Sequence, residues 1–209
     1  MADGFIQKLR QVFGLNIIED TDVEIYCKKW YSPIPNIAYK NKRKVTSLSY
    51  SVFLNEMITP RAWMIGAVKK GVLLKPDDRF QRVRNMGNVI AKKLTWTDDK
   101  NLDKSGDYYL YPSETLTLLK GDCEDHAYVM QSCLPDDLGV AYGFFRDGGH
   151  AFNVTVIDGE LWIVDTVGDS VVTVRYDAQK DYVIHYILTE RMTFLVKPGV
   201  AFGDLAGYD

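Results

Sequence analysis

Hydrophobic residues recur with two different periods along the chain. In the first part, apolar positions three or four residues apart predict helices over residues 61–70 and 80–94 and a short one near the N-terminus, before Gly14. A short helical turn begins at Pro112. A further helix begins at about Asp122 and ends at about Leu134, just before a proline. The polar stretch 97–108 between these segments indicates a loop.

Beyond Gly139 the pattern changes to short runs of β-branched and aromatic residues, typical of strands. Asp147-Gly148-Gly149 and Asp158-Gly159 are strong turn signals between consecutive runs. Helices followed by hairpin-linked strands indicate an α+β fold with an antiparallel sheet. The expected strands span residues 140–145, 151–157, 161–164, 171–175, 182–188 and 191–196.

The first 75 residues differ from the rest in their pattern of prolines, charges and hydrophobic residues. They contain Pro33, Pro35 and a basic cluster at Lys40–Lys44, followed by a strand-like run over 45–53. We therefore expect an N-terminal extension over residues 1–75, a candidate docking segment, and a core domain over residues 76–209.

Composition narrows the function classes. The 209 residues are 46% hydrophobic and 25% charged, with a net charge of −3, so disorder and a basic nucleic-acid-binding surface are both disfavoured. No run of 18 apolar residues predicts a membrane span, and the N-terminus lacks the pattern of a signal peptide. The expectation is a soluble protein of the cytoplasm or of a virion.

The chain has three cysteines, too few for a disulfide framework. Cys123 falls in the first turn of an expected helix, where backbone N–H groups and the helix dipole favour a thiolate. His150 heads one expected strand and Asp165 ends the next. A hairpin turn centred on Asp158 would place these two side chains within about one residue of each other across the ladder. A thiol, a base and an orienting carboxylate are the parts of thiol catalysis.

Three sequence blocks carry a specific resemblance. Gly121-Asp-Cys-Glu-Asp125, Gly149-His-Ala-Phe152 and Leu161-Trp-Ile-Val-Asp165 are similar to the core of the transglutaminase-like superfamily of papain-fold cysteine enzymes. The upstream stretch 107–116 resembles the lead-in of bacterial transglutaminase-like cysteine proteases. The resemblance covers roughly residues 80–167.

The resemblance implies a papain-like fold with Cys123 as nucleophile, His150 as general base and acid, and Asp165 orienting the imidazole. It implies a thiol protease or related hydrolase that cleaves amide bonds in a protein or peptide through a thioester. Transamidation or deamidation is an alternative within the same fold. A catalytically idle binding module, or a virion-associated structural protein, is a further alternative. Backbone N–H groups would form the oxyanion hole, with Trp96 as a candidate helper.

Carboxylates surround the candidate nucleophile. Asp122 suits an N-cap, but Asp122, Glu124 and Asp125 together should raise the thiol's pKa and oppose its reactivity. A bound cation would relieve this conflict, and the resemblance makes Asp122 and Glu124 candidate calcium ligands. The stretch Asp99–Asp103 starts like an EF-hand loop but lacks its glycine and final glutamate, so only a looser calcium loop remains an option there.

The other candidate residues have simpler interpretations. Cys27 and Cys133 are expected to fill the core, and His185 to pack in a strand. Asn153 is an alternative partner for His150. A zinc site from Cys123, His126 and Cys133 is disfavoured, because its spacing matches no standard finger.

Overall fold

The computed structural model describes residues 20–34, 38–42, 49–71, 78–102 and 109–196. The helix expected before Gly14 and Asp103 lie outside these ranges. The helices are α2 (Asp22–Trp30), α3 (Trp63–Gly71), α4 (Arg79–Lys93), α5 (Asp99–Leu102), α6 (Pro112–Leu118) and α7 (Cys123–Cys133), with 3-10 turns η1 (Leu54–Met57) and η2 (Tyr176–Ala178). Within the described ranges, no helix combines the length and apolarity needed to cross a membrane.

Antiparallel pairing organises the large sheet. It has seven strands in the order β1-β11-β10-β6-β7-β8-β9. Two small sheets, β2-β3 and β4-β5, lie beside it, and β4 runs parallel to β5. The bounds are β1 (Ser32–Ile34), β2 (Ala38–Lys42), β3 (Ser49–Phe53), β4 (Thr95–Trp96), β5 (Lys120–Gly121), β6 (Gly139–Phe145), β7 (Gly148–Ile157), β8 (Glu160–Asp165), β9 (Val172–Arg175), β10 (Tyr182–Leu188) and β11 (Thr193–Leu195).

These elements confirm the predicted α+β fold. The segment expected to be a loop over 97–108 differs in one place, because Asp99–Leu102 forms α5, with the side chain of Asp98 accepting a hydrogen bond from the Lys100 N–H. Just before it, β4 exists only because Thr95 and Trp96 pair with Lys120 and Gly121 of β5. This non-local pairing leaves no periodic signal in the sequence.

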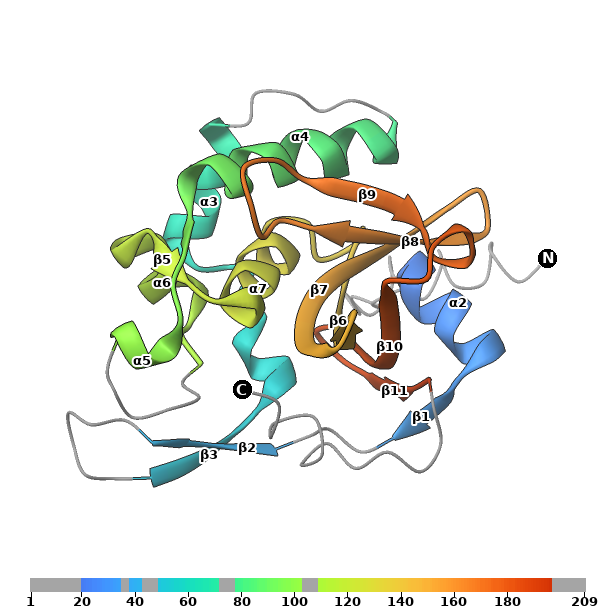
Figure 1. Cartoon of the computed structure of the whole chain (residues 1–209), viewed down its shortest axis with the longest axis horizontal. Helices are drawn as coiled ribbons and strands as arrows, with labels where there is room; N and C mark the ends of the chain where they lie inside the picture. Colours follow the sequence, from blue (N-terminus) through green and yellow to red (C-terminus); the bar gives the residue numbers. More distant parts are fainter. Residues whose placement is uncertain (1–19, 35–37, 43–48, 72–77, 103–108, 197–209) are drawn as a thin grey trace, which may run out of the picture.

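Helices cover both faces of the sheet (Figure 1). Helix α7 packs on β7 from one face, while α2 contacts β7 from the other. Side chains alternate accordingly along β7: Ala151 joins the cluster formed with α7, whereas Phe152 and Val154 join the cluster that contains Val23 of α2. The boundary at residue 75 stays a prediction, and α2, on its N-terminal side, packs directly on the sheet.

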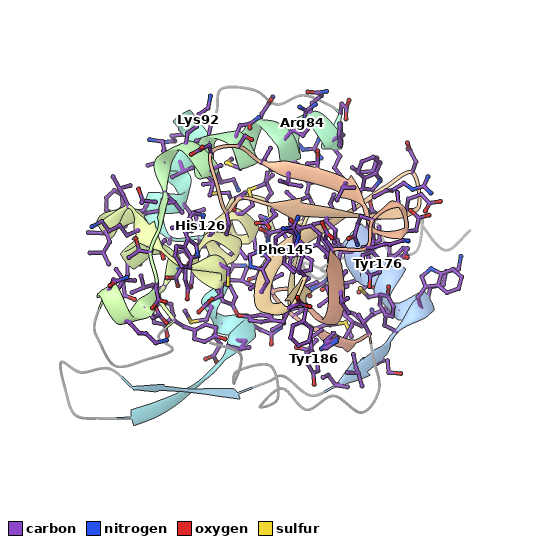
Figure 2. All side chains as sticks on the ribbon, viewed as in Figure 1. Arg84, Lys92, His126, Phe145, Tyr176 and Tyr186 are labelled. Atoms are coloured by element: carbon purple, nitrogen blue, oxygen red, sulfur yellow. The ribbon has the colours of Figure 1, made fainter. Side chains whose placement is uncertain are left out.

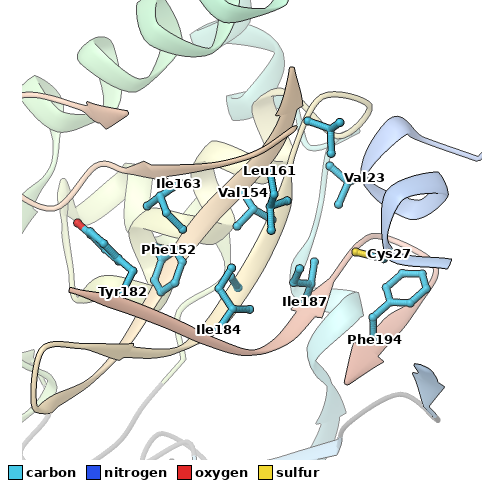
Figure 3. Close-up of a cluster of buried hydrophobic side chains, with 12 residues drawn as sticks. Val23, Cys27, Phe152, Val154, Leu161, Ile163, Tyr182, Ile184, Ile187 and Phe194 are labelled. Atoms are coloured by element: carbon cyan, nitrogen blue, oxygen red, sulfur yellow. The ribbon is translucent and has the colours of Figure 1, made fainter. Parts of the chain in front are cut away.

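The sheet is strongly curled. Tyr182 and Ile184 of β10 share one buried cluster with Leu161 and Ile163 of β8, although two strands separate β10 from β8 in the sheet order (Figure 3). Flat neighbouring strands lie about 4.8 Å apart, so such contacts require curvature. The curl brings the ends of β7, β8 and β10 together.

Gly143 is indispensable where this curl is tight. It lies opposite His150 on β7, and a Cβ at this position would lie 1.8 Å from the carbonyl oxygen of Val183 on β10. The irregular register between Ile184 and Tyr186 lies beside this approach. Two backbones therefore come so close here that only glycine fits.

We expect Gly143→Ala to lower the free energy of unfolding by about 2 kcal/mol or more, because backbone has to move to admit the methyl group. Urea denaturation measures this change. The matched control is Gly66→Ala on α3, where an added Cβ meets nothing within 4 Å. That variant should be stabilised by up to about 1 kcal/mol through its higher helix propensity. Equal effects of the two substitutions would contradict the close approach at Gly143.

Candidate active site

The thiol of Cys123 lies where α7 begins. Asp122 is the N-cap residue, as expected, but its side chain accepts no capping hydrogen bond. Cys123 is half-buried, and the backbone N–H of Ala151 on β7 donates a hydrogen bond to its sulfur. The thiol therefore contacts the residue that directly follows His150.

His150 and Asp165 meet at the ends of β7 and β8. The imidazole Nε2 lies 2.7 Å from Asp165 Oδ2, and both side chains are largely buried. The strand register differs from the expected one, because the turn is centred between Asp158 and Gly159, and Val154 pairs with Ile163. If this register continued by one more pair, Phe152 would lie opposite Asp165. His150 therefore reaches the carboxylate diagonally across the two strands, from two residues along β7.

The carboxylate of Asp165 is held by several donors. Its Oδ1 accepts the Val167 N–H at 3.0 Å, and its Oδ2 accepts the hydroxyl of Tyr182 at 3.0 Å besides bonding His150. Burial alone would raise the pKa of Asp165, but these bonds and the charge of His150 outweigh it and lower that pKa. Asp165 is thus an anion at neutral pH.

Aromatic rings enclose the imidazole. Phe152 stacks on His150 with a centroid separation of 5.8 Å, and Phe145 and Tyr182 lie 5.9 and 6.3 Å away. Phe145 lies on the sheet and His126 on α7 (Figure 2). With these rings around it, the His150 side chain is only 13% exposed.

Burial and neighbouring carboxylates keep the Cys123 thiol protonated, and the sequence pattern predicted the effect of the carboxylates. Cys123 Sγ donates a hydrogen bond to Glu124 Oε2 at 3.2 Å. Burial raises the pKa of Cys123 well above its ordinary value, and the charges of Glu124 and Asp122 raise it further. The Ala151 N–H opposes this shift but does not overcome it.

Among the residues that the structure describes, two acidic groups have ligand atoms close enough to hold a metal ion. Asp122, Cys123 and Glu124 form one, and Asp99, Asp122 and Asp125 form the other, each with ligand atoms within 4.8 Å of one another. The second group consists of oxygen donors alone, as calcium prefers. Burial raises the pKa of Asp125 well above its usual range, and the charge of Asp122 adds to this. Asp125 Oδ2 is buried without a hydrogen-bond partner, so the donors suit a cation.

The remaining candidates have structural roles. Asn153 does not contact His150; its amide donates to the carbonyls of Ala127 and Gly139, at 3.0 and 3.3 Å. Cys27 and Cys133 are fully buried, and His185 packs edge-on against Phe144. These findings confirm the core positions expected for both cysteines and the packed position of His185.

Of two further candidates, Trp96 lies next to the start of the thiol helix and His126 lies on it. Trp96 is 52% exposed and pairs through its backbone with Gly121, two residues before Cys123. His126 is buried, with its Nδ1 3.3 Å from the Thr166 carbonyl. In the described part of the chain, no cluster of metal-ligating atoms includes His126 or Cys133.

Sequence reasoning missed two residues of this site. The sequence pattern places Asp125 only among the carboxylates around Cys123, although its spacing of three residues from Asp122 sets both on one helix face. Tyr182 carries no local signal, because only the curl of the sheet brings β10 to Asp165.

Comparison with known proteins identifies the fold. No protein-family model and no curated protein sequence matches the chain. Solved structures do. EGTA-treated LapG of Legionella pneumophila is 19% identical, with 64% of this chain and 75% of LapG covered and a TM-score of 0.50. Calcium-bound LapG gives 18% identity, coverage of 68% and 83%, and a TM-score of 0.49. A TGase is 10% identical, with 80% of this chain and 38% of the TGase covered and a TM-score of 0.40.

LapG is a transglutaminase-like cysteine protease. At 19% identity the likeness to LapG concerns the fold. The chain therefore has a transglutaminase-like, papain-type α+β fold, the architecture of cysteine proteases.

Proposed function

We propose that this protein is a cysteine-dependent hydrolase that cleaves amide bonds in a protein or peptide through Cys123, His150 and Asp165. One observation carries the proposal. The thiol at the start of α7 contacts the backbone of Ala151, and the neighbouring His150 has one ring nitrogen fixed by a buried carboxylate. An imidazole oriented by a carboxylate in this way can take a proton from a thiol that comes within hydrogen-bond reach of its other nitrogen.

The bond between His150 and Asp165 supports one proton route. Because Nε2 faces Asp165, Nδ1 is the nitrogen left to accept the proton of Cys123. The thiolate adds to the amide carbonyl, and His150 returns the proton to the leaving amine. The resulting thioester is hydrolysed by water, which His150 activates in turn. The backbone N–H of Cys123 is the proposed oxyanion donor.

Iodoacetamide at pH 7 should label Cys123 in preference to Cys27 and Cys133, because the side chains of the latter two are fully buried. His150→Ala should slow the labelling of Cys123 by at least about tenfold, through loss of the base. Mass spectrometry of tryptic peptides locates and times the label.

His185→Ala is the matched control, since His185 packs away from the thiol against Phe144. Labelling spread equally over the three cysteines, or a Cys123 rate that is the same in wild type and His150→Ala, would refute the proposed enzyme.

The hydrogen bond from Cys123 to Glu124 favours the protonated, less reactive thiol. A bound cation is proposed to offset this effect. Asp122 and Glu124 stay the candidate ligands, now joined by Asp99 and Asp125. Calcium fits this oxygen-rich set. When bound, it would supply positive charge that offsets the carboxylates around Cys123. LapG has a calcium-bound form, which supports the choice of metal.

Glu124→Gln tests the electrostatic part of this idea. Removing one negative charge beside the thiol should lower the pKa of Cys123, so labelling should reach its half-maximal rate at a lower pH than in wild type. A pH profile of alkylation without added metal measures the shift. Glu160→Gln, on the exposed end of β8, should leave the profile unchanged. An upward shift, or none, in Glu124→Gln would contradict the assigned role of Glu124.

Calcium should raise the melting temperature of the protein relative to a chelator-treated sample. The reason is that a cation relieves the repulsion among Asp99, Asp122 and Asp125. Asp125→Asn should abolish most of the increase, whereas the exposed Asp136→Asn should retain it. A calcium-dependent shift of equal size in both variants would place the cation elsewhere.

A further inference from the structure

Asp165 Oδ2 accepts two hydrogen bonds, one from His150 and one from a residue outside the proposed triad. The hydroxyl of Tyr182 lies 3.0 Å from this oxygen, and Nε2 of His150 lies 2.7 Å from it. The bond from Tyr182 is buried, and the bond from His150 is partly buried. A carboxylate bound by only one of these donors could rotate about its Cβ–Cγ bond. In Asp165, two donors on one oxygen and the Val167 N–H on the other fix the plane of the carboxylate.

Tyr182 is itself held firmly in place. Its backbone N–H donates to the side-chain oxygen of Gln179 at 2.6 Å, and its carbonyl accepts from the side-chain nitrogen of the same residue at 3.0 Å. Its backbone also pairs with Phe145 of β6. These contacts fix the starting point from which the ring extends toward β8.

Packing alone does not explain a tyrosine at this position. The ring contacts Phe152 with a centroid separation of 5.0 Å (Figure 3). It also contacts Phe145 at 4.7 Å, and phenylalanine would fill the same space. The side chain is 8% exposed, and a buried hydroxyl is costly unless it is hydrogen-bonded. Asp165 Oδ2 is the partner that satisfies it.

We propose that Tyr182 is a positioning residue, whose hydroxyl fixes the Asp165 carboxylate and thereby the orientation of the His150 imidazole toward Cys123. The inference rests on the proposed function for its consequence in reactivity. The positioning itself is a structural claim that can be tested without any activity.

The first test measures geometry. In protein labelled with ¹⁵N-histidine, NMR should show the Nε2 proton of His150 protected from exchange with water, with a nuclear Overhauser contact to the Tyr182 hydroxyl or ring. Tyr182→Phe should accelerate that exchange by about tenfold, since the shared acceptor is freer to rotate. Tyr176→Phe is the matched control, because its hydroxyl accepts from the Ile184 N–H and does not contact Asp165. A missing contact in wild type, or unchanged exchange in Tyr182→Phe, overturns the proposal without requiring any variant to be active.

The second test is a double-mutant cycle on the rate of Cys123 labelling by iodoacetamide at pH 7. Tyr182→Phe should slow labelling about three- to tenfold in the wild-type background, and by less than about twofold in an Asp165→Asn background, because its effect passes through Asp165. Equal slowing in both backgrounds would mean that Tyr182 acts by another route and would overturn the proposal.

Wild type and His150→Ala are run beside the cycle. If these two label equally, the proposed hydrolase fails, and the exchange measurement alone decides whether Tyr182 positions Asp165. If they differ and Tyr182→Phe labels like wild type, the hydrolase stands and the role of Tyr182 falls.

Discussion

The packing of α7 against β7 is the constraint on which the site depends. Asn153, in the middle of β7, donates hydrogen bonds to the carbonyls of Ala127 on α7 and Gly139 at the start of β6, which joins the helix to the sheet at one buried point. From there the helix runs back to Cys123 and the strand runs back to Ala151, where sulfur and backbone meet. A buried amide without these partners would be costly, so the junction resists sliding.

A second constraint is electrostatic and concerns the protonation of the Cys123 thiol. The helix N-terminus and the Ala151 N–H favour a thiolate, whereas burial, Glu124 and Asp122 favour the thiol and prevail. The same carboxylates belong to acidic groups with the spacing of metal ligands. One set of charges thus accounts for both a protonated thiol at the proposed nucleophile and a candidate calcium site.

Much of this arrangement could be predicted from local sequence. The turn signal at Asp158-Gly159 and the flanking β-prone runs indicate a hairpin, and the structure contains it as β7 and β8. The glycine and acidic residues before Cys123 correctly indicate a helix start. The exact register was wrong, because a two-residue turn is centred between Asp158 and Gly159 rather than on one residue, and this shifts every pair.

The sequence by itself determined the α+β class, the start of the thiol helix, and the neighbourhood of His150 and Asp165, because each depends on periodicity or on a turn a few residues long. Only the tertiary structure decided that Asp99 joins Asp122 and Asp125, that Gly143 must be glycine, and that Tyr182 reaches Asp165. These contacts join elements distant along the chain, and they follow from the curl of the sheet and the packing of helices on it, which no local pattern encodes.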